Sequence, residues 1–165
     1  ARDRQRLLQA LAGIRREGLR LGPLGRWDLV SPDGASPATL RDRQWTAMPE
    51  GARQWATVTP YVYDRHAKAK DRAAYERQLA DAVRESWQRV CQPAGVSVQV
   101  VVTPVSAHAG ALPSHAFPRL PRKDGSHCRH THLILTFDRP VVGPVLLGAG
   151  RFRGYGLCHP LEGER

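Results

Sequence analysis

The segment "THLILTF", residues 131–137, alternates apolar and polar side chains with the period of two that is typical of a half-buried β-strand. One side of this strand carries large apolar residues, namely Leu133, Leu135 and Phe137. The opposite side carries polar ones, namely His130, His132 and Thr136. The pattern predicts a strand with its apolar side in the core and its imidazoles on the other face of a sheet.

A second segment, "WATVTPYVY" at residues 55–63, alternates in the same way, and Pro60 within it indicates an edge or a bulge. Its aromatic residues share one side of the strand, namely Trp55, Tyr61 and Tyr63. The other side carries Ala56, Val58 and Val62. We expect the aromatic side to lie beside His130 and His132 on a face of the sheet that is free of helices.

The remaining elements follow from periodicity and turn signals. Residues 71–91 predict an amphipathic helix with Asp71 as its N-cap, and residues 143–148 predict one or two further helical turns. Residues 96–104 and 155–161 predict strands. The order β-α-β-β-α-β predicts an α+β domain of the ferredoxin-like (RRM-like) plan, with its first and third strands as central neighbours.

We expect this domain to span residues 55–165, and residues 1–54 to form an N-terminal appendage or the tail of a preceding domain. Apolar residues at helical spacing predict a helix over residues 1–17. The chain opens without Met, which predicts a piece of a longer polypeptide. It carries no signal peptide and no apolar run of roughly 18 residues, so we expect no membrane association. Its three scattered cysteines favour a reducing cytoplasm.

The strongest compositional feature is a basic charge dominated by arginine. Lys and Arg together number 25 against 15 for Asp and Glu, which gives a formal charge of +10. Only three of these cations are lysines, namely Lys68, Lys70 and Lys123. Arginine grips phosphate with two parallel hydrogen bonds and stacks on bases, so nucleic acid is the expected partner. The alternative is a charged surface that only keeps the protein soluble.

An open sheet face with aromatic and histidine side chains is typical of domains that bind single-stranded RNA. The predicted face would carry the aromatic residues of 55–63 together with His130 and His132. The alternative is that this face packs against another part of the protein. Residues 104–130, 27 in all, form a long basic excursion that leads from the second strand to the third, and loops of this length are usually functional or disordered.

The segment "GAGRFRGYGL", residues 148–157, precedes the last predicted strand. It could be a tight turn, a phosphate cradle or a loop that lies against another polymer, and it matches neither a P-loop nor a dinucleotide fingerprint. We expect RNA contacts from the glycines and arginines, and stacking or packing from the aromatic residues. The residues concerned are Gly148, Gly150, Arg151, Phe152, Arg153, Gly154 and Tyr155.

A basic domain of this plan that ends in such a glycine loop resembles the RAMP superfamily of CRISPR-associated proteins, and most closely its repeat-processing endoribonucleases. The resemblance covers roughly residues 50–161 and rests on "WATVTPYVYDRHAK" (55–68), "FP" (117–118) and residues 130–161. These segments look like the form found in subtype I-U/I-G systems. There the nuclease is the C-terminal half of a fusion with a second RAMP subunit, which grips the 5′ handle of the crRNA. The chain departs from that form in lacking the first RAMP domain and in the shortness of its second predicted helix.

The resemblance implies an enzyme that cleaves CRISPR repeat RNA to mature crRNA and remains in the type I effector complex (Cascade). The implied partners are the repeat RNA and the other effector subunits, including an upstream RAMP domain. The alternative is a non-catalytic crRNA-binding RAMP subunit of the same complex.

RNA supplies its own nucleophile, the 2′-OH, so cleavage needs a base, an acid and a cation rather than a metal. We expect His66 in "YDRHAK" to act as the general acid or base, with Tyr61 orienting the 2′-OH and Lys68 stabilising the phosphorane charge. Arg65 and Lys70 would bind the phosphates. The alternative for His66 is a solvated histidine at a turn; were His66 not required, His132 or His115 would be the next candidates.

The cluster "HCRHTH", residues 127–132, invites a zinc interpretation. Structural zinc sites usually have two separated pairs of ligands, whereas this is one cluster divided between a loop and a strand face. We therefore expect no metal and no cofactor. Cys158 and His159 would point to opposite faces of a strand, which argues against thiol catalysis.

Overall fold

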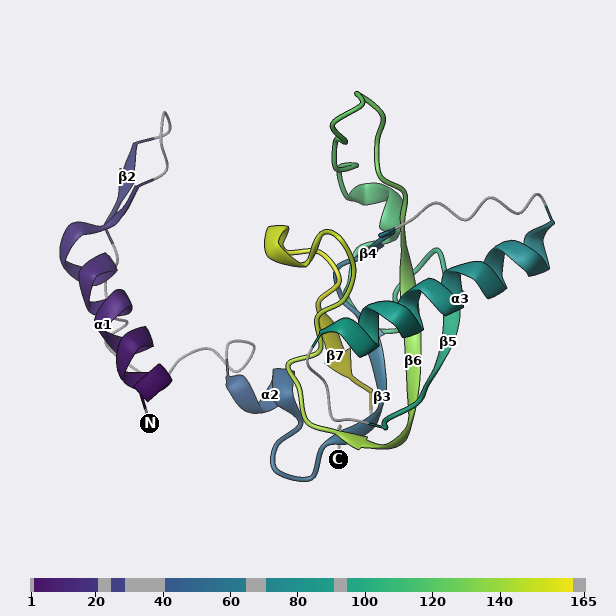
Figure 1. The fold of residues 1–165 in the computed structure, drawn as a ribbon, viewed down its shortest axis with the longest axis horizontal. Helices are drawn as coiled ribbons and strands as arrows, with labels where there is room; N and C mark the ends of the chain where they lie inside the picture. The colour runs from purple at the N-terminus through teal and green to yellow at the C-terminus, as the bar shows by residue number, and fades with distance from the viewer. Residues whose placement is uncertain (1, 21–24, 29–40, 65–70, 91–94, 162–165) are drawn as a thin grey trace. The chain divides into compact units, whose positions relative to one another are not determined.

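The chain comprises two compact units, Ala1–Pro37 and Ala38–Arg165, each of which is described by itself. A computed structural model describes residues 2–20, 25–28, 41–64, 71–90 and 95–161 (Figure 1). The boundary expected at residues 54/55 lies within the second unit. The short helix α2 (Asp42–Thr46) joins this unit through a hydrogen bond from the Gly143 amide to the Thr46 carbonyl oxygen, 2.8 Å long.

The first unit contains the predicted N-terminal helix, α1 (Arg2–Glu17), and a small hairpin. Strands β1 (Leu19–Arg20) and β2 (Arg26–Trp27) pair antiparallel. On α1, Leu8 and Leu11 are exposed. The sequence prediction of a helix over residues 1–17 is thus confirmed.

The second unit is built on an antiparallel sheet that curls around its longest strand, β6 (His130–Val141). This strand pairs with β3 (Ala52–Thr57), with β4 (Tyr61–Val62) and with β5 (Val98–Thr103). The last strand, β7 (Cys158–Pro160), pairs with the other edge of β3. All four predicted strand regions therefore contain strands, and the first and third are neighbours as expected. The break between β3 and β4 surrounds Pro60.

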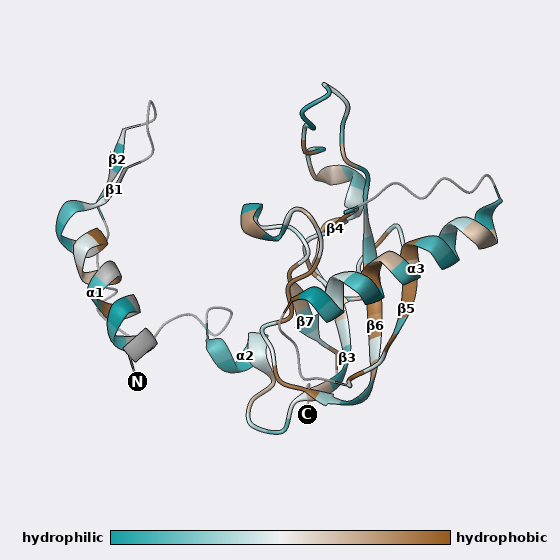
Figure 2. Cartoon of the chain, in the orientation of Figure 1, coloured by the Kyte–Doolittle hydropathy of each residue, from teal (hydrophilic) through white to brown (hydrophobic). Residues whose placement is uncertain are grey.

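Helix α3 (Arg72–Arg89) crosses one face of this sheet (Figure 1). Its N-terminus is capped as predicted, because the Asp71 carboxylate accepts a hydrogen bond of 2.8 Å from the Ala74 amide. Its inner face buries Leu79, Val83 and Trp87. Figure 2 shows the hydrophobic residues of β5 and β6 behind it. None of the helices in the described part of the chain is long and apolar enough to cross a membrane.

The aromatic residues of the first strand lie in the core, so the prediction that they form an open face is wrong. Trp55 pairs directly with Leu135, and side chains of paired residues share one face of a sheet. Trp55 and Tyr61 are fully buried and Tyr63 is 5% exposed. The three aromatic residues do share one side, as the alternation predicts, but it is the side toward α3. Burying such large apolar surfaces stabilises the fold more than exposing them.

The opposite face is partly covered by the excursion between β5 and β6. The Ser106 hydroxyl donates to the Thr57 carbonyl oxygen, and Leu112 places its carbonyl oxygen 3.0 Å from a His132 ring nitrogen. The short 3₁₀ helix η3 (Ser114–Ala116) lies in this excursion. The described residues left exposed or half-exposed in the middle of this face are a mixture of polar and β-branched apolar side chains, namely Gln54, Gln99, Val101, Ile134 and Thr136.

The second helix predicted over residues 143–148 is absent from the structure. This segment runs as irregular chain beside the last strand and pairs with it instead. The Cys158 amide donates to the Val145 carbonyl oxygen, and the Leu147 amide donates to the Gly156 carbonyl oxygen. Backbone groups that pair with a neighbouring segment are not available for the hydrogen bonds of a helix. For this reason the segment does not form the helix that its local sequence favours.

Candidate nucleic-acid interface

The glycine loop folds back onto β4, and its glycines are required by close packing and backbone conformation. Gly148 and Gly156 have positive φ angles of 87° and 71°. A Cβ on Gly148 would lie 2.6 Å from the Val62 carbonyl oxygen, and one on Gly156 would overlap the Leu147 carbonyl. Gly150 packs as closely against Val62 and Tyr155. These glycines let the loop lie directly on the strand.

Most amides of this loop are engaged within the protein. The amides of Arg151, Arg153 and Tyr155 donate to carbonyl oxygens of the loop itself, at 3.3, 2.8 and 3.2 Å. The Ala149 amide donates to the Val62 carbonyl oxygen. A backbone phosphate cradle needs several amides that point outward together. The side chains, and not the backbone, therefore give this loop its capacity to bind anions.

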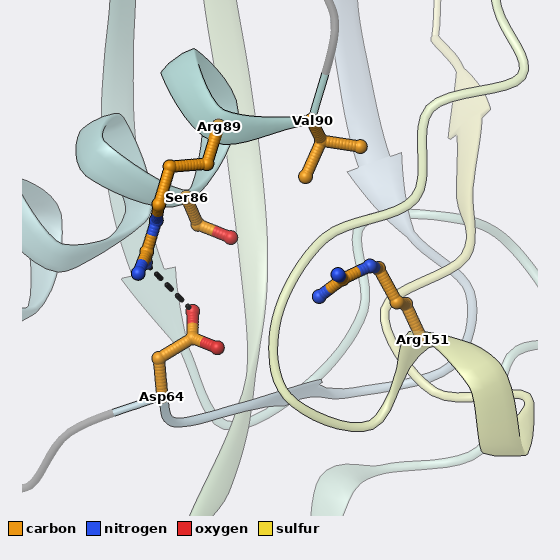
Figure 3. A pocket seen from close by; sticks show the side chains of 5 residues that line it. All are labelled: Asp64, Ser86, Arg89, Val90 and Arg151. Carbon is orange, nitrogen blue, oxygen red and sulfur yellow. Dashed lines mark ion pairs between the residues drawn. The ribbon is translucent and has the colours of Figure 1, made fainter.

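The side chain of Arg151 reaches from the 3₁₀ helix η4 (Arg151–Arg153) into a pocket of about 100 Å³. The pocket lies between the glycine loop, the end of the segment after β4 and the last turns of α3 (Figure 3). Its lining comprises Asp64, Ser86, Arg89, Val90 and Arg151. Two guanidinium groups and a hydroxyl around one small pocket form a site suited to a phosphate group.

Hydrogen bonds hold the pocket in place. A guanidinium nitrogen of Arg151 donates to the Gly148 carbonyl oxygen over 3.2 Å. The Gly148 amide in turn donates to the Ser86 hydroxyl over 3.3 Å, which ties the loop to α3. The packing that requires the glycines thus also positions Arg151.

Tyr61, predicted to orient the 2′-OH, reaches this pocket only through Asp64. Its side chain is fully buried, and its hydroxyl donates to an Asp64 carboxylate oxygen over 3.0 Å. Burial, reinforced by the negative charge of Asp64, raises the pKa of Tyr61 well above its ordinary value. Tyr61 therefore keeps its proton and holds the Asp64 carboxylate. Because its side chain is fully buried, the prediction that Tyr61 itself orients the 2′-OH is corrected.

The other predicted catalytic and phosphate-binding residues, at positions 65–70, lie outside the described residues. They are Arg65, His66, Lys68 and Lys70. Asp64, which the structure does describe, immediately precedes Arg65 and lines the pocket. The roles of these four residues stay predictions.

His132 holds the excursion onto the sheet. Its ring is fully buried, with one nitrogen 3.0 Å from the Thr57 hydroxyl and the other 3.0 Å from the Leu112 carbonyl oxygen. Tyr155, also predicted to contact RNA, is 7% exposed and donates its hydroxyl to the Pro118 carbonyl oxygen. Both residues fasten the same excursion, and neither lines the pocket beside Arg151.

His130 lies half-buried beside the Tyr155 ring, with the ring centroids 6.1 Å apart. Both of its ring nitrogens are shielded from solvent and lack a hydrogen-bond partner of ordinary geometry. Desolvation lowers its pKa, and the charge of Arg119 adds to the effect, although the nearby Phe117 backbone partly opposes it.

Acid should therefore destabilise this protein through two histidines of β6, the half-buried His130 and the buried His132. The pKa values of His130 and His132 are lowered from 6.5, chiefly by desolvation, so the unfolded chain binds more protons than the folded one as the pH falls from about 6.5 toward the lowered folded-state values. We expect the free energy of unfolding to fall as pH drops from 7.5 to 5. Urea unfolding of the His130→Gln chain should show a shallower fall, and the exposed His115→Gln control should match the original chain. Equal slopes in all three would contradict this assignment.

Phe152 is the most exposed large hydrophobic residue of the described chain, at 87%. The Arg151 guanidinium carbon lies 4.5 Å from its ring centroid, within the range of a cation–π contact. Arg153 beside it is also exposed. An exposed aromatic ring beside arginine side chains is suited to stack on an unpaired base.

Sequence reasoning did not single out three members of the pocket, namely Asp64, Ser86 and Arg89. Ser86 and Arg89 are three residues apart on α3. The helical period alone therefore predicts that their side chains are neighbours on the helix. No local spacing places them beside residues 64 and 151. Their proximity to those residues arises from the packing of α3 on the sheet.

The part of the chain that the structure describes contains no group of three or more His, Cys, Asp or Glu side chains arranged to bind a metal. Cys128 of the "HCRHTH" cluster accepts a hydrogen bond from Arg122 over 3.4 Å. Cys158 is buried, and desolvation raises the pKa of its thiol, which keeps it protonated. Comparison with protein-family models, with curated proteins and with solved structures gave no match to this chain.

Proposed function

We propose that this protein binds RNA and cleaves it at the pocket formed by the glycine loop and α3. In this proposal the RNA is a CRISPR repeat transcript, and the cleaved crRNA stays bound within a cytoplasmic type I effector complex that includes an upstream RAMP domain. The second unit is proposed to be a ferredoxin-like RAMP domain. The pairing of β3 with β6 supports this plan, and the irregular chain in place of a second helix is a departure from it.

The observation that carries the proposal is the position of Arg151. A glycine loop brings this arginine to a small pocket that already holds Arg89, at the point where "YDRHAK" begins. Two arginines at one pocket can neutralise a phosphate and the additional charge of a phosphorane. The formal charge of +10 would draw a polyanion to this surface.

The proposed reaction uses the 2′-OH of the RNA as the nucleophile. The 2′ oxygen forms a bond to phosphorus and loses its proton to a base, while the bond from phosphorus to the 5′ oxygen breaks and that oxygen is protonated. His66 is assigned one of these proton transfers. The products are a 2′,3′-cyclic phosphate and a 5′-hydroxyl end.

A non-catalytic crRNA-binding subunit is the second candidate. It is favoured by the composition of the pocket, because the described residues that line it include no histidine. Such a pocket can bind a phosphate but supplies no imidazole for proton transfer. Cleavage therefore depends on His66.

Incubation of the chain with end-labelled repeat RNA in EDTA separates the two candidates. Cleavage to a product ending in a 2′,3′-cyclic phosphate supports the nuclease. Binding that shifts the RNA without cutting it supports the binding subunit. No binding under low salt would contradict both.

Replacing Arg151 and Arg153 together with alanine should weaken RNA binding and reduce its salt dependence. Each lost phosphate contact removes about one unit from the slope of log affinity against log salt concentration. Fluorescence anisotropy at a series of NaCl concentrations measures this slope. Arg72→Ala with Arg77→Ala, two exposed arginines of α3, provides the matched change in charge. An unchanged slope in the loop variant would leave the loop without a phosphate contact.

A further inference from the structure

Asp64 is an unexpected residue in a pocket that suits a phosphate. Its carboxylate lines the same pocket as Arg89 and Arg151, and like charges would repel a phosphate there. The side chain is 18% exposed, so it is partly withdrawn from solvent. A carboxylate in this position calls for a ligand group that donates a hydrogen.

The carboxylate of Asp64 still has capacity to accept hydrogen bonds. An ionised carboxylate has about four acceptor positions, and the Tyr61 hydroxyl occupies one of them on the side toward the core. The shortest approach to Arg89 is 3.7 Å, which is longer than an N–H···O hydrogen bond. Figure 3 shows the group facing the pocket across from Arg151. Asp64 and Arg89 form this longer ion pair, drawn as the dashed line in Figure 3, and the Arg89 Nε donates to the Glu85 carbonyl oxygen. Arg89 thus keeps its terminal N–H groups for a phosphate, and Asp64 keeps acceptor positions for a hydroxyl.

We infer that this pocket binds one ribonucleotide step of an RNA strand, with its phosphate between Arg89 and Arg151 and its ribose 2′-OH donating a hydrogen bond to Asp64. This inference rests on the proposed RNA binding and adds the group that distinguishes RNA from DNA. The 2′-OH and the 3′-phosphate are attached to adjacent ribose carbons, so both can reach a single pocket. A 2′-OH is the feature by which proteins separate the two nucleic acids at a given site.

Tyr61 has a defined part in this arrangement. Because its pKa is raised, it remains a donor and fixes the carboxylate from behind. The second carboxylate oxygen then keeps its acceptor positions for the pocket. Asp64→Asn retains an oxygen for Tyr61 but replaces the charged acceptor with a neutral amide, so the fold is kept while the ribose contact is weakened.

The first experiment compares RNA with DNA of the same sequence. Both are single-stranded and bind to the full chain carrying His66→Ala, so that cleavage does not consume the RNA. We expect Asp64→Asn to lower the preference for RNA at least about tenfold, since a hydrogen bond to a charged group is worth that much. DNA affinity should stay or rise, because a negative charge is lost. Asp81→Asn is the matched control: it removes the same charge from an exposed ion pair with Arg84 on α3.

The second experiment changes the RNA and leaves the fold untouched. Single 2′-deoxy or 2′-O-methyl substitutions are placed at successive positions of the bound RNA. We expect one position at which both substitutions weaken binding about tenfold, since each removes the donated hydrogen. That loss should disappear in the Asp64→Asn chain.

The outcomes separate this inference from the function on which it rests. RNA binding that shows no sensitive position, or a sensitive position that persists in Asp64→Asn, would overturn the ribose contact and leave RNA binding in place. A 2′-O-methyl group tolerated where 2′-deoxy is not would mean that the 2′ oxygen accepts, and would also overturn it. Absence of RNA binding by the unmodified chain would overturn both.

Discussion

Replacing His66 with alanine is expected to lower the rate of RNA cleavage at least about 100-fold, the usual scale for loss of a general acid or base. RNA affinity should change little. A neutral imidazole contributes proton transfer, whereas the proposed phosphate contacts come from arginines that line the pocket, such as Arg89 and Arg151. Single-turnover cleavage of labelled repeat RNA and anisotropy on the same variants measure the two quantities separately.

Two controls tie this result to the proposed mechanism. Cleavage by the original chain should persist in EDTA, and it should vanish when the nucleotide 5′ of the scissile phosphate is 2′-deoxy, because the nucleophile is then missing. Wild-type rates in the His66→Ala chain would contradict the assignment. His115, which is exposed in the excursion, would then be the next candidate, since both ring nitrogens of His132 face hydrogen-bond partners inside the protein.

Gly156→Ala is expected to destabilise the second unit by about 3 kcal/mol. Part of this comes from a φ of 71°, which an L-residue adopts only at a cost. The larger part comes from overlap of the new Cβ with the backbone of Leu147, whose amide is hydrogen-bonded to the Gly156 carbonyl oxygen. Backbone cannot move aside as a flexible side chain can. Urea denaturation followed by tryptophan fluorescence measures the loss.

Gly154→Ala is the matched control within the same loop. Gly154 has a similar φ of 81°, but a Cβ there would meet nothing within 4 Å. The free energy of unfolding should therefore fall only by the cost of holding an L-residue at a positive φ, about 1 kcal/mol. Equal losses in the two variants would mean that close packing of the loop on its neighbours contributes nothing to stability.

The sequence determined where the four strand regions and the two long helices of this protein lie, and which residues of a strand share a side. Alternation located the strands at 55–63 and 131–137 and kept Trp55 on the same side as Tyr61 and Tyr63. Helical periodicity with an aspartate cap located α3. The positions of strands and helices depend on residues that are close along the chain. They can therefore be predicted from an apolar repeat of two residues in a strand or of 3.6 residues in a helix.

Only the tertiary structure decided which side of the first strand faces α3. Alternation separates two sides but does not orient them, and the apolar Ala56 and Val62 made the wrong side equally plausible as core. The register of Trp55 opposite Leu135 settles the orientation. Likewise, "GPVLLG" has the composition of a short helix, and it was pairing with the last strand that overrode this propensity.

The candidate site likewise contains residues that the sequence indicates and residues that only the tertiary structure brings together. Arg151 and the glycine loop were evident from composition, because four glycines and two arginines within ten residues are a local signal. Asp64, Ser86 and Arg89 carry no local signal, since each is an ordinary residue at a strand end or on a helix surface. They meet Arg151 because α3 packs across the sheet and Ser86 accepts a hydrogen bond from the glycine loop. A pocket formed from segments that are distant in sequence is a property of packing, which no residue pattern within one segment encodes.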